Sequence, residues 1–317
     1  MLLFMRLING SVLLLRSGGK AQFGTGERNG FLVKGLTPVH ITILKWIFEK
    51  QNWYNSHLER RFPENKKEVG DILKMLSDGG LTAKHQVPDG DCACAFHLYG
   101  SDAPIKARKE ALIGISGLGP LGISLSRKLV ACGIKSLILR DHEQVKTRDL
   151  CVYSDEQLGA VRQDVAPLLL GVNKQLPNRS VTLEIAICSY LTNPTWAEAC
   201  IKQGLPHLPI IKRETEIEVG PLFIPGRTCC LHCQHLAKRD VDPEWPQLAA
   251  QLTGSDPVMA DTSLSEYATA FAVREILSYL AGLPVSLVGA SWVFNPADPL
   301  PQVRQWLPHP QCGCVSC

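Results

Sequence analysis

Cysteines are grouped in two places along the chain, at positions 229, 230 and 233 and at positions 312, 314 and 317. Zinc prefers four ligands in a tetrahedron, and thiolate pairs on two short turns supply such a set. In a reducing compartment, this spacing indicates a metal rather than disulfides. The sequence therefore predicts one structural zinc site with four ligands: Cys230, Cys233, Cys312 and Cys314. Cys317 remains an alternative to Cys314, and the competing interpretation is a group of buried cysteines without metal.

A glycine-rich loop follows an apolar segment at 111–115 that we expect to be a strand. Its glycines have the spacing Gly-x-Gly-x-x-Gly: Gly117, Gly119 and Gly122. Leucines at spacing four then predict a helix, and a second strand is expected at 136–139, closed by Asp141. Such glycines permit a tight turn and close approach of backbone N–H groups to phosphates, and such an acid binds a ribose hydroxyl. The pattern predicts a nucleotide site, unless the glycines serve only to pack the helix.

The elements that must position these residues belong to an α/β domain that we place at 106–317. Further strands are expected at 185–187, 208–211 and 214–219. Ser263 and Glu266 have the spacing of a capping box in front of a helix that reaches Leu280. The order of strands and helices predicts a Rossmann-like fold that carries the zinc site at its C-terminal end.

The first 105 residues predict a separate small α+β domain. Short strands are expected at 3–7, 12–16 and 30–33, the first two as a hairpin around Asn9 and Gly10. Helices are expected from Pro38 and over 66–77. Two more strands, 81–87 and 95–99, would be joined through 88–90. Helices followed by a hairpin give the order of a winged helix, whose exposed strand edge could accept a peptide.

Length and charge limit the function classes. The chain has 317 residues and a net charge of +3, which fits two domains and argues against nucleic acid as the main partner. Arg6 and Asn9 interrupt the apolar N-terminus well before a membrane span is complete, and no cleavage site of a signal peptide follows. We therefore expect a cytoplasmic protein without a membrane partner, and a homodimer is left open.

Longer motifs point to a family. The glycine loop, the acid after the second strand and the late cysteine pairs resemble the ThiF/MoeB ubiquitin-activating-like adenylyltransferases over 106–317. Three segments are similar to one branch of them, the ThiF-like leader-peptide-binding partners of YcaO cyclodehydratases: Val219-Gly-Pro-Leu-Phe-Ile-Pro-Gly-Arg-Thr-Cys-Cys-Leu-His-Cys233, Asp242-Pro-Glu-Trp-Pro246 and His309-Pro-Gln-Cys-Gly-Cys314. The resemblance implies a structural zinc and an N-terminal winged-helix-like domain that binds a precursor peptide as an added strand.

The chain departs from the adenylating members of that family. The Lys of their Gly-x-x-Lys becomes Arg162 in Gly159-Ala-Val-Arg162, and their Arg-Gln pair is absent after Leu150. The strand at 185–187 is followed by Cys188 where the family has an Asp that holds Mg²⁺. Adenylation needs these charges around the α-phosphate, so ATP and Mg²⁺ binding at Gly117, Gly119, Gly122, Asp141 and Arg162 is expected to be weak or absent.

Three functions compete on this basis. The first is a non-catalytic, zinc-stabilised protein that binds a ribosomally made precursor peptide and presents it to a YcaO-type modifying enzyme. The second is an ATP-dependent adenylyltransferase that activates the C-terminal carboxylate of a peptide or small protein, with Arg162 in place of the lysine. A nicotinamide oxidoreductase that uses Asp141 for the ribose is the third, and the cysteine pairs argue against it.

Overall fold

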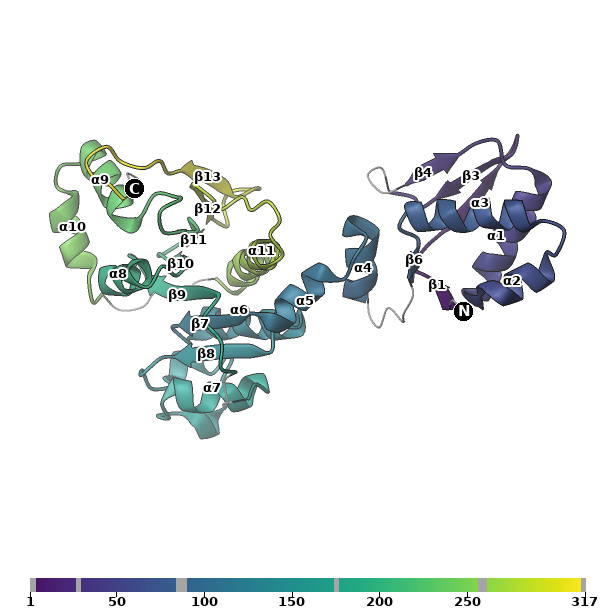
Figure 1. Ribbon diagram of the computed structural model, residues 1–317. Helices are drawn as coiled ribbons and strands as arrows, with labels where there is room; N and C mark the ends of the chain where they lie inside the picture. The colour runs from purple at the N-terminus through teal and green to yellow at the C-terminus, as the bar shows by residue number, and fades with distance from the viewer. Residues whose placement is uncertain (1–3, 27–29, 84–89, 174–176, 256–260, 315–317) are drawn as a thin grey trace. The chain divides into compact units, whose positions relative to one another are not determined.

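The computed structural model of the chain describes residues 4–26, 30–83, 90–173, 177–255 and 261–314 (Figure 1). The chain divides into two compact units, Met1–Ile105 and Lys106–Cys317. Each unit is built around hydrophobic residues of its own.

The described strands of the first unit form two three-stranded antiparallel sheets. In one sheet, β1 (Phe4–Leu7) lies between β5 (Asn52–Tyr54) and β6 (Thr82–Ala83). The other sheet has the order β2 (Leu13–Arg16), β3 (Lys20–Phe23) and β4 (Phe31–Val33). Since β4 pairs only with β3 among the described strands, it is an edge strand.

The described residues of the first unit also form helices, the last of which crosses the boundary: α1 (Pro38–Lys50), α2 (Asn55–Arg61), α3 (Lys66–Asp78), α4 (Gly90–Tyr99) and α5 (Ala103–Glu110). The predicted start of α1 is confirmed, because Pro38 occupies the first turn and the Thr37 side chain accepts the N–H of His40. The expected helix at 66–77 is also present as α3, and Val69, Ile72 and Leu76 bury its apolar face.

Two predictions for this unit were wrong. Asn9 and Gly10 do not close a hairpin, because β1 and β2 belong to different sheets. Residues 95–99 lie in α4 rather than in a strand, so the second half of the expected wing is helical. The reason is burial. Cys92, Ala93 and Ala95 lie in one apolar cluster, and a helix places residues at this spacing on the same side. Most of the other expected strand, 84–87, and the connection at 88–89 lie outside the described residues.

The second unit contains a mixed seven-stranded sheet. Its order is β13 (Gln302–Gln305), β12 (Ala290–Phe294), β11 (Ile217–Val219), β10 (His207–Lys212), β9 (Leu183–Ser189), β7 (Leu112–Ser116) and β8 (Ser136–Arg140). The last four strands in this order are parallel, whereas β11, β12 and β13 add antiparallel pairs. From β7 the chain goes first to β8 on one side and later to β9 on the other. In an open α/β sheet, ligands bind where the order reverses in this way.

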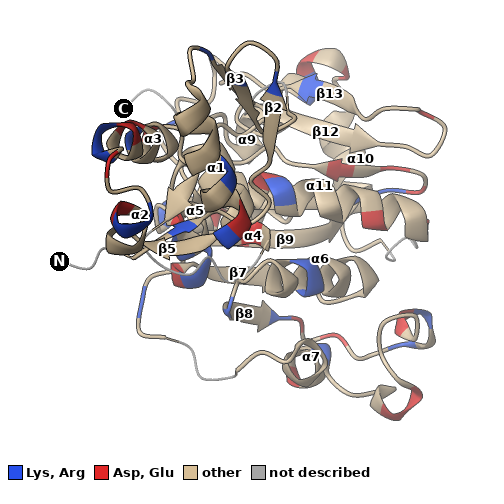
Figure 2. Ribbon diagram, turned by 90° about the vertical axis from the view of Figure 1, so that its right-hand side faces the viewer, with Lys and Arg blue, Asp and Glu red and all other residues tan. Residues whose placement is uncertain are grey.

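Helices complete the second unit: α6 (Pro120–Ala131), α7 (Arg162–Leu170), α8 (Pro194–Lys202), α9 (Leu231–Val241), α10 (Trp245–Leu252) and α11 (Thr262–Leu280), with two short 3₁₀ turns, η1 (Thr147–Asp149) and η2 (Asp155–Gln157). Helices α6 and α11 run side by side (Figure 2). The predicted capping box was wrong, because Asp261 caps α11 by accepting the N–H of Leu264 at 2.9 Å. Within the described ranges, no helix is long and apolar enough to cross a membrane.

Candidate functional site

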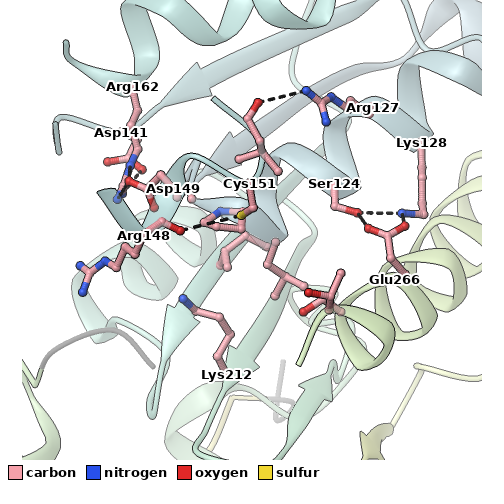
Figure 3. Close-up of a pocket in the computed structure, with 18 of the residues that line it drawn as sticks. Ser124, Arg127, Lys128, Asp141, Arg148, Asp149, Cys151, Arg162, Lys212 and Glu266 are labelled. Carbon is pink, nitrogen blue, oxygen red and sulfur yellow. Dashed lines mark hydrogen bonds and ion pairs between the residues drawn. The ribbon is translucent and has the colours of Figure 1, made fainter. Parts of the chain in front are cut away.

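A cavity of about 680 Å³ lies at the carboxyl ends of the parallel strands (Figure 3). The predicted site residues Gly117, Gly119, Asp141 and Arg162 all line it, whereas Gly122 lies in the first turn of α6 and does not. The strand ends meet here because parallel strands present their carboxyl ends at the same edge of a sheet. The structure therefore brings most of these residues to one place.

The three glycines of the loop have different roles. At Gly117, where φ is +90°, a Cβ would come within 2.8 Å of the Ile187 carbonyl oxygen, and at Gly122 it would come within 2.0 Å of the Gly117 oxygen. A Cβ at Gly119, which caps α6, would meet no atom within 4 Å. Two glycines are thus explained by packing, and only the third leaves open space that a ligand could enter.

Asp141 and Arg162 contact each other in the wall of the cavity. Asp141 Oδ2 accepts the N–H of Leu118 at 2.6 Å and Nη1 of Arg162 at 3.1 Å. Arg162 also donates from Nη2 and Nε to one oxygen of Asp149, at 2.7 and 3.1 Å. Burial alone lowers the pKa of Arg162, but the two carboxylates outweigh this effect and raise it. These three buried side chains form what we call the arginine triad: Asp141, Asp149 and Arg162.

The other carboxylates that line the cavity are also paired. Glu143 accepts Nζ of Lys146 at 2.7 Å. Glu266 accepts both Lys128 Nζ and, at 2.6 Å, the Ser124 hydroxyl, which ties α11 to α6. The end of β9 carries Cys188, whose pKa burial raises to about 11. Every carboxylate among the described lining residues is therefore engaged with a cation.

Several cations line the cavity that sequence reasoning did not single out: Arg127, Lys128, Arg148 and Lys212. Arg127 donates to the Val152 carbonyl at 3.1 Å. Burial lowers the pKa of Lys212, and the charges of Arg148 and Arg162 lower it further. The position of Lys212 at the end of a predicted parallel strand was the only local signal that could have drawn attention to any of them.

The four predicted zinc ligands come together in space. Cys230 Sγ lies 3.4 Å from Cys312 Sγ, and Cys233 Sγ lies 3.2 Å from Cys314 Sγ. Their sulfurs all lie within 4.8 Å of one another, so the cluster could hold a metal ion. Four sulfurs arranged tetrahedrally around zinc, at Zn–S distances of about 2.3 Å, lie about 3.8 Å apart. The alternative ligand Cys317 lies outside the described residues.

The surroundings affect the sulfurs of the cluster differently, because burial raises the pKa of Cys312 to about 11 and raises that of Cys314 further, whereas the pKa of Cys233 is lowered. Burial raises the pKa of Cys233, but backbone N–H groups, above all that of His309, donate to its sulfur and bring the pKa to about 7. The imidazole of His309 is itself held by Asp240 at 2.8 Å. The apolar residues around the cluster include Trp196, Phe223 and Trp306. Four cysteine ligands would fill a tetrahedral zinc site and leave no position for water or substrate, as expected of a structural rather than a catalytic site.

No family model and no curated protein matches this chain. Among solved structures it is similar to E. coli MccB in complex with AMPCPP and MccA, with 15% identity, a TM-score of 0.68, and coverage of 99% of this chain and 100% of that one. The structure of the microcin C7 biosynthetic enzyme MccB with N-formylated MccA gives 15% identity, coverage of 98% and 99%, and a TM-score of 0.65. The heterocyclase TruD matches at 14% identity and a TM-score of 0.66, over 98% of this chain but 42% of its own length.

The chain shares the fold of these proteins. The α/β, Rossmann-like architecture predicted for 106–317 agrees with this fold and with the mixed seven-stranded sheet of the second unit. At this identity, the similarity establishes neither their activity nor their ligands for this chain.

Proposed function

We propose that this protein is a non-catalytic ThiF-like protein that binds a ribosomally made precursor peptide and presents it to a modifying enzyme of the YcaO type. The observation that carries the proposal is a groove of about 500 Å³ between β4 and α3 in the first unit. Phe31 and Val33 line it from β4, whereas Asp71, Lys74 and Met75 line it from α3.

The groove has the features that peptide addition to a sheet requires. Strand β4 is an edge strand, so its outer backbone groups are available to an extended segment. Its side chains alternate, with Phe31 and Val33 on the groove side and Leu32, 43% exposed, on the other face. An added strand would gain affinity from main-chain hydrogen bonds and specificity from alternate side chains that enter the groove. The sequence analysis expected the strand edge of the wing to accept a peptide, whereas the groove is lined by β4 and α3.

The cavity of the second unit supports the non-catalytic half of the proposal. Adenylation requires cations and a metal that stabilise charge on the transferred phosphate. Here the buried arginine is engaged by two carboxylates, and the acids that could coordinate Mg²⁺ are themselves in ion pairs.

The similar structures support the part of the proposal that concerns binding of a precursor peptide. Two of the MccB structures are described as holding MccA, N-formylated in one of them, and TruD is described as a heterocyclase. The YcaO-type partner rests on the sequence motifs of residues 219–233, 242–246 and 309–314.

A binding titration tests the peptide proposal. The full-length protein would be titrated with synthetic leader segments of the short open reading frames beside its gene, and we expect micromolar or tighter binding by at least one. Val33→Asn should weaken that binding at least tenfold, because Val33 faces the groove. Leu32→Asn, the adjacent position on the opposite face of β4, is the matched control and should bind normally. Equal binding by both variants would place the peptide elsewhere, and no binding of any leader would refute the proposal.

The alternative function, an ATP-dependent adenylyltransferase, is favoured by the size of the cavity, which is large enough for a mononucleotide. Gly119, which lines this cavity, also leaves open space beside its Cα. ATP–pyrophosphate exchange in the presence of Mg²⁺ and leader peptide separates the two functions. We expect no exchange above a protein-free blank. Exchange that is lost in Arg162→Ala but kept in Arg127→Ala would establish the adenylyltransferase instead.

A further inference from the structure

The groove between β4 and α3 in the first unit carries charge as well as apolar surface. Three exposed charged residues of α3 line it: Asp71, Lys74 and Asp78. At separations of three, four and seven residues, they lie on one face of the helix. Within the described residues, none of the three takes part in an ion pair. A ligand in the groove would therefore meet charges that are not already neutralised.

Asp78 lies at the end of the groove that Phe31 occupies. A Cβ at Gly79 would come within 2.5 Å of the Phe31 ring, so this ring lies against the C-terminal end of α3. Asp78 directly precedes Gly79, whereas Asp71 lies about 10 Å further along the helix. Phe31 and Asp78 thus form one end of the groove.

This end of the groove is negatively charged. The C-terminal end of a helix carries partial negative charge, which nearby cations stabilise. The last turn of α3 contains no basic residue and contains Asp78 instead. Lys74 is better placed to offset Asp71, because an acid that precedes a base along a helix pairs more favourably than the reverse order. A cation from a ligand would therefore be stabilised beside Asp78.

The Phe31 ring favours the same kind of ligand group. It stacks on the fully buried ring of Phe23, with centroids 5.0 Å apart, and is itself only partly buried. The side chain of a lysine or arginine is attracted to the face of an aromatic ring. Val33, two residues further along β4, and Met75, one helical turn before Gly79, add apolar surface next to this end.

We propose that the groove selects an extended peptide segment with a lysine or arginine side chain beside Asp78 and Phe31, and an apolar side chain two residues away, beside Val33 and Met75. The separation follows from strand geometry, because alternate residues of an added strand face the same side, as Phe31 and Val33 do on β4. This inference rests on the peptide binding proposed above and adds the chemistry of the bound segment.

Fluorescence anisotropy with the full-length protein and two short synthetic peptides tests the selection. Each peptide carries valine, a test residue and valine at alternate positions, with serine and threonine between them, and the test residue is lysine or glutamate. We expect the lysine peptide to bind about fivefold more tightly at low ionic strength, and the difference to shrink in high salt, because exposed charges are screened. Equal binding of the two peptides, or binding of neither, would overturn the inference. Neither result would affect the proposed function if a leader binds in the titration described above.

A charge reversal connects the preference to Asp78. In Asp78→Lys the glutamate peptide should become the tighter ligand, and the variant should stay folded, since a cation suits the C-terminal end of a helix. Glu49→Lys is the matched control, because it reverses an exposed acid in the last turn of α1, outside the groove. It should leave the preference for lysine unchanged. Melting curves show whether each variant is folded, and a preference for lysine that persists in folded Asp78→Lys would overturn the inference.

Discussion

At the scale of single residues, Arg162 shows how one side chain can change role with its surroundings. A cation at this position could hold a phosphate, but here its side chain is 7% exposed and contacts two carboxylates. The triad joins the loop after β7, through the Leu118 N–H, to the 3₁₀ turn η1 and to the start of α7. In this structure, the triad holds these three segments together at the wall of the cavity.

Arg162→Leu tests that role. Removing one partner from a buried ion pair leaves charge without compensation and typically costs about 3–5 kcal/mol. We expect a loss of that size in the free energy of unfolding measured by urea denaturation. Arg127→Leu, an exposed change at the same cavity, should cost well under 1 kcal/mol. Adding Asp149→Asn to Arg162→Leu should recover part of the loss, and a double variant no more stable than the single one would contradict this account.

At the scale of elements, Glu218 connects the antiparallel strands that extend the sheet. This buried carboxylate of β11 accepts the Ser291 hydroxyl of β12 at 2.6 Å and Arg213 Nη2 at 2.7 Å. The indole N–H of Trp306, which follows β13, donates to the same Ser291 hydroxyl at 2.8 Å. The network therefore links β11 and β12 to Arg213, which follows β10, and to the segment that leads into the second cysteine pair.

The stability that Glu218 contributes should depend on pH. Burial alone raises its pKa, but the Arg213 charge and the hydrogen bonds from Ser291 and Arg213 outweigh burial, so the folded-state pKa is lowered. The contribution is then complete above the ordinary glutamate pKa of about 4.3 and is lost as the pH falls through the lower, folded-state value. Urea denaturation between pH 7 and 3 should show the difference between wild type and Glu218→Gln shrinking below about pH 4.3. Glu198→Gln, on the exposed face of α8, should show no such convergence, and a constant difference for Glu218→Gln would contradict the prediction.

At the scale of the whole molecule, the two units have separate cores, and the cysteine cluster belongs to the second alone. It joins the start of α9 to the end of the described chain. We propose that it holds a structural zinc ion, which would make the folding of the second unit dependent on the metal.

Metal removal should therefore affect the two units differently. We expect about one zinc per chain by elemental analysis and its loss in Cys230→Ser, with Cys151→Ser as the control at an exposed thiol. Hydrogen exchange in the presence of a strong chelator should accelerate in α9 and β12, while α1 and α3 keep their protection. Metal-free protein with normal exchange in both units would show that the cluster needs no ion.

Local patterns were enough to predict the features that depend on neighbouring residues. The strand–loop–helix–strand unit around Gly117, the start of α1 and the helix α3 follow from glycine spacing, capping and periodicity, which act within a few residues. The cysteine spacing predicted which four sulfurs lie together, since a metal site requires paired ligands on short turns. The prediction of a strand at 95–99 was wrong, because a short apolar segment fits a buried helix as well as a strand.

Only the tertiary structure decided what the charged residues do. Asp141, Asp149 and Arg162 are separated along the chain, and nothing in their local sequence shows that they neutralise one another in a buried triad. Arg148 and Lys212 likewise line one cavity only because β8 and β10 end at the same edge of the sheet, and β4 borders α3 only once the first unit is folded. The physical reason is that desolvation and pairing determine the behaviour of a charge, and both depend on distant parts of the chain that folding brings around it.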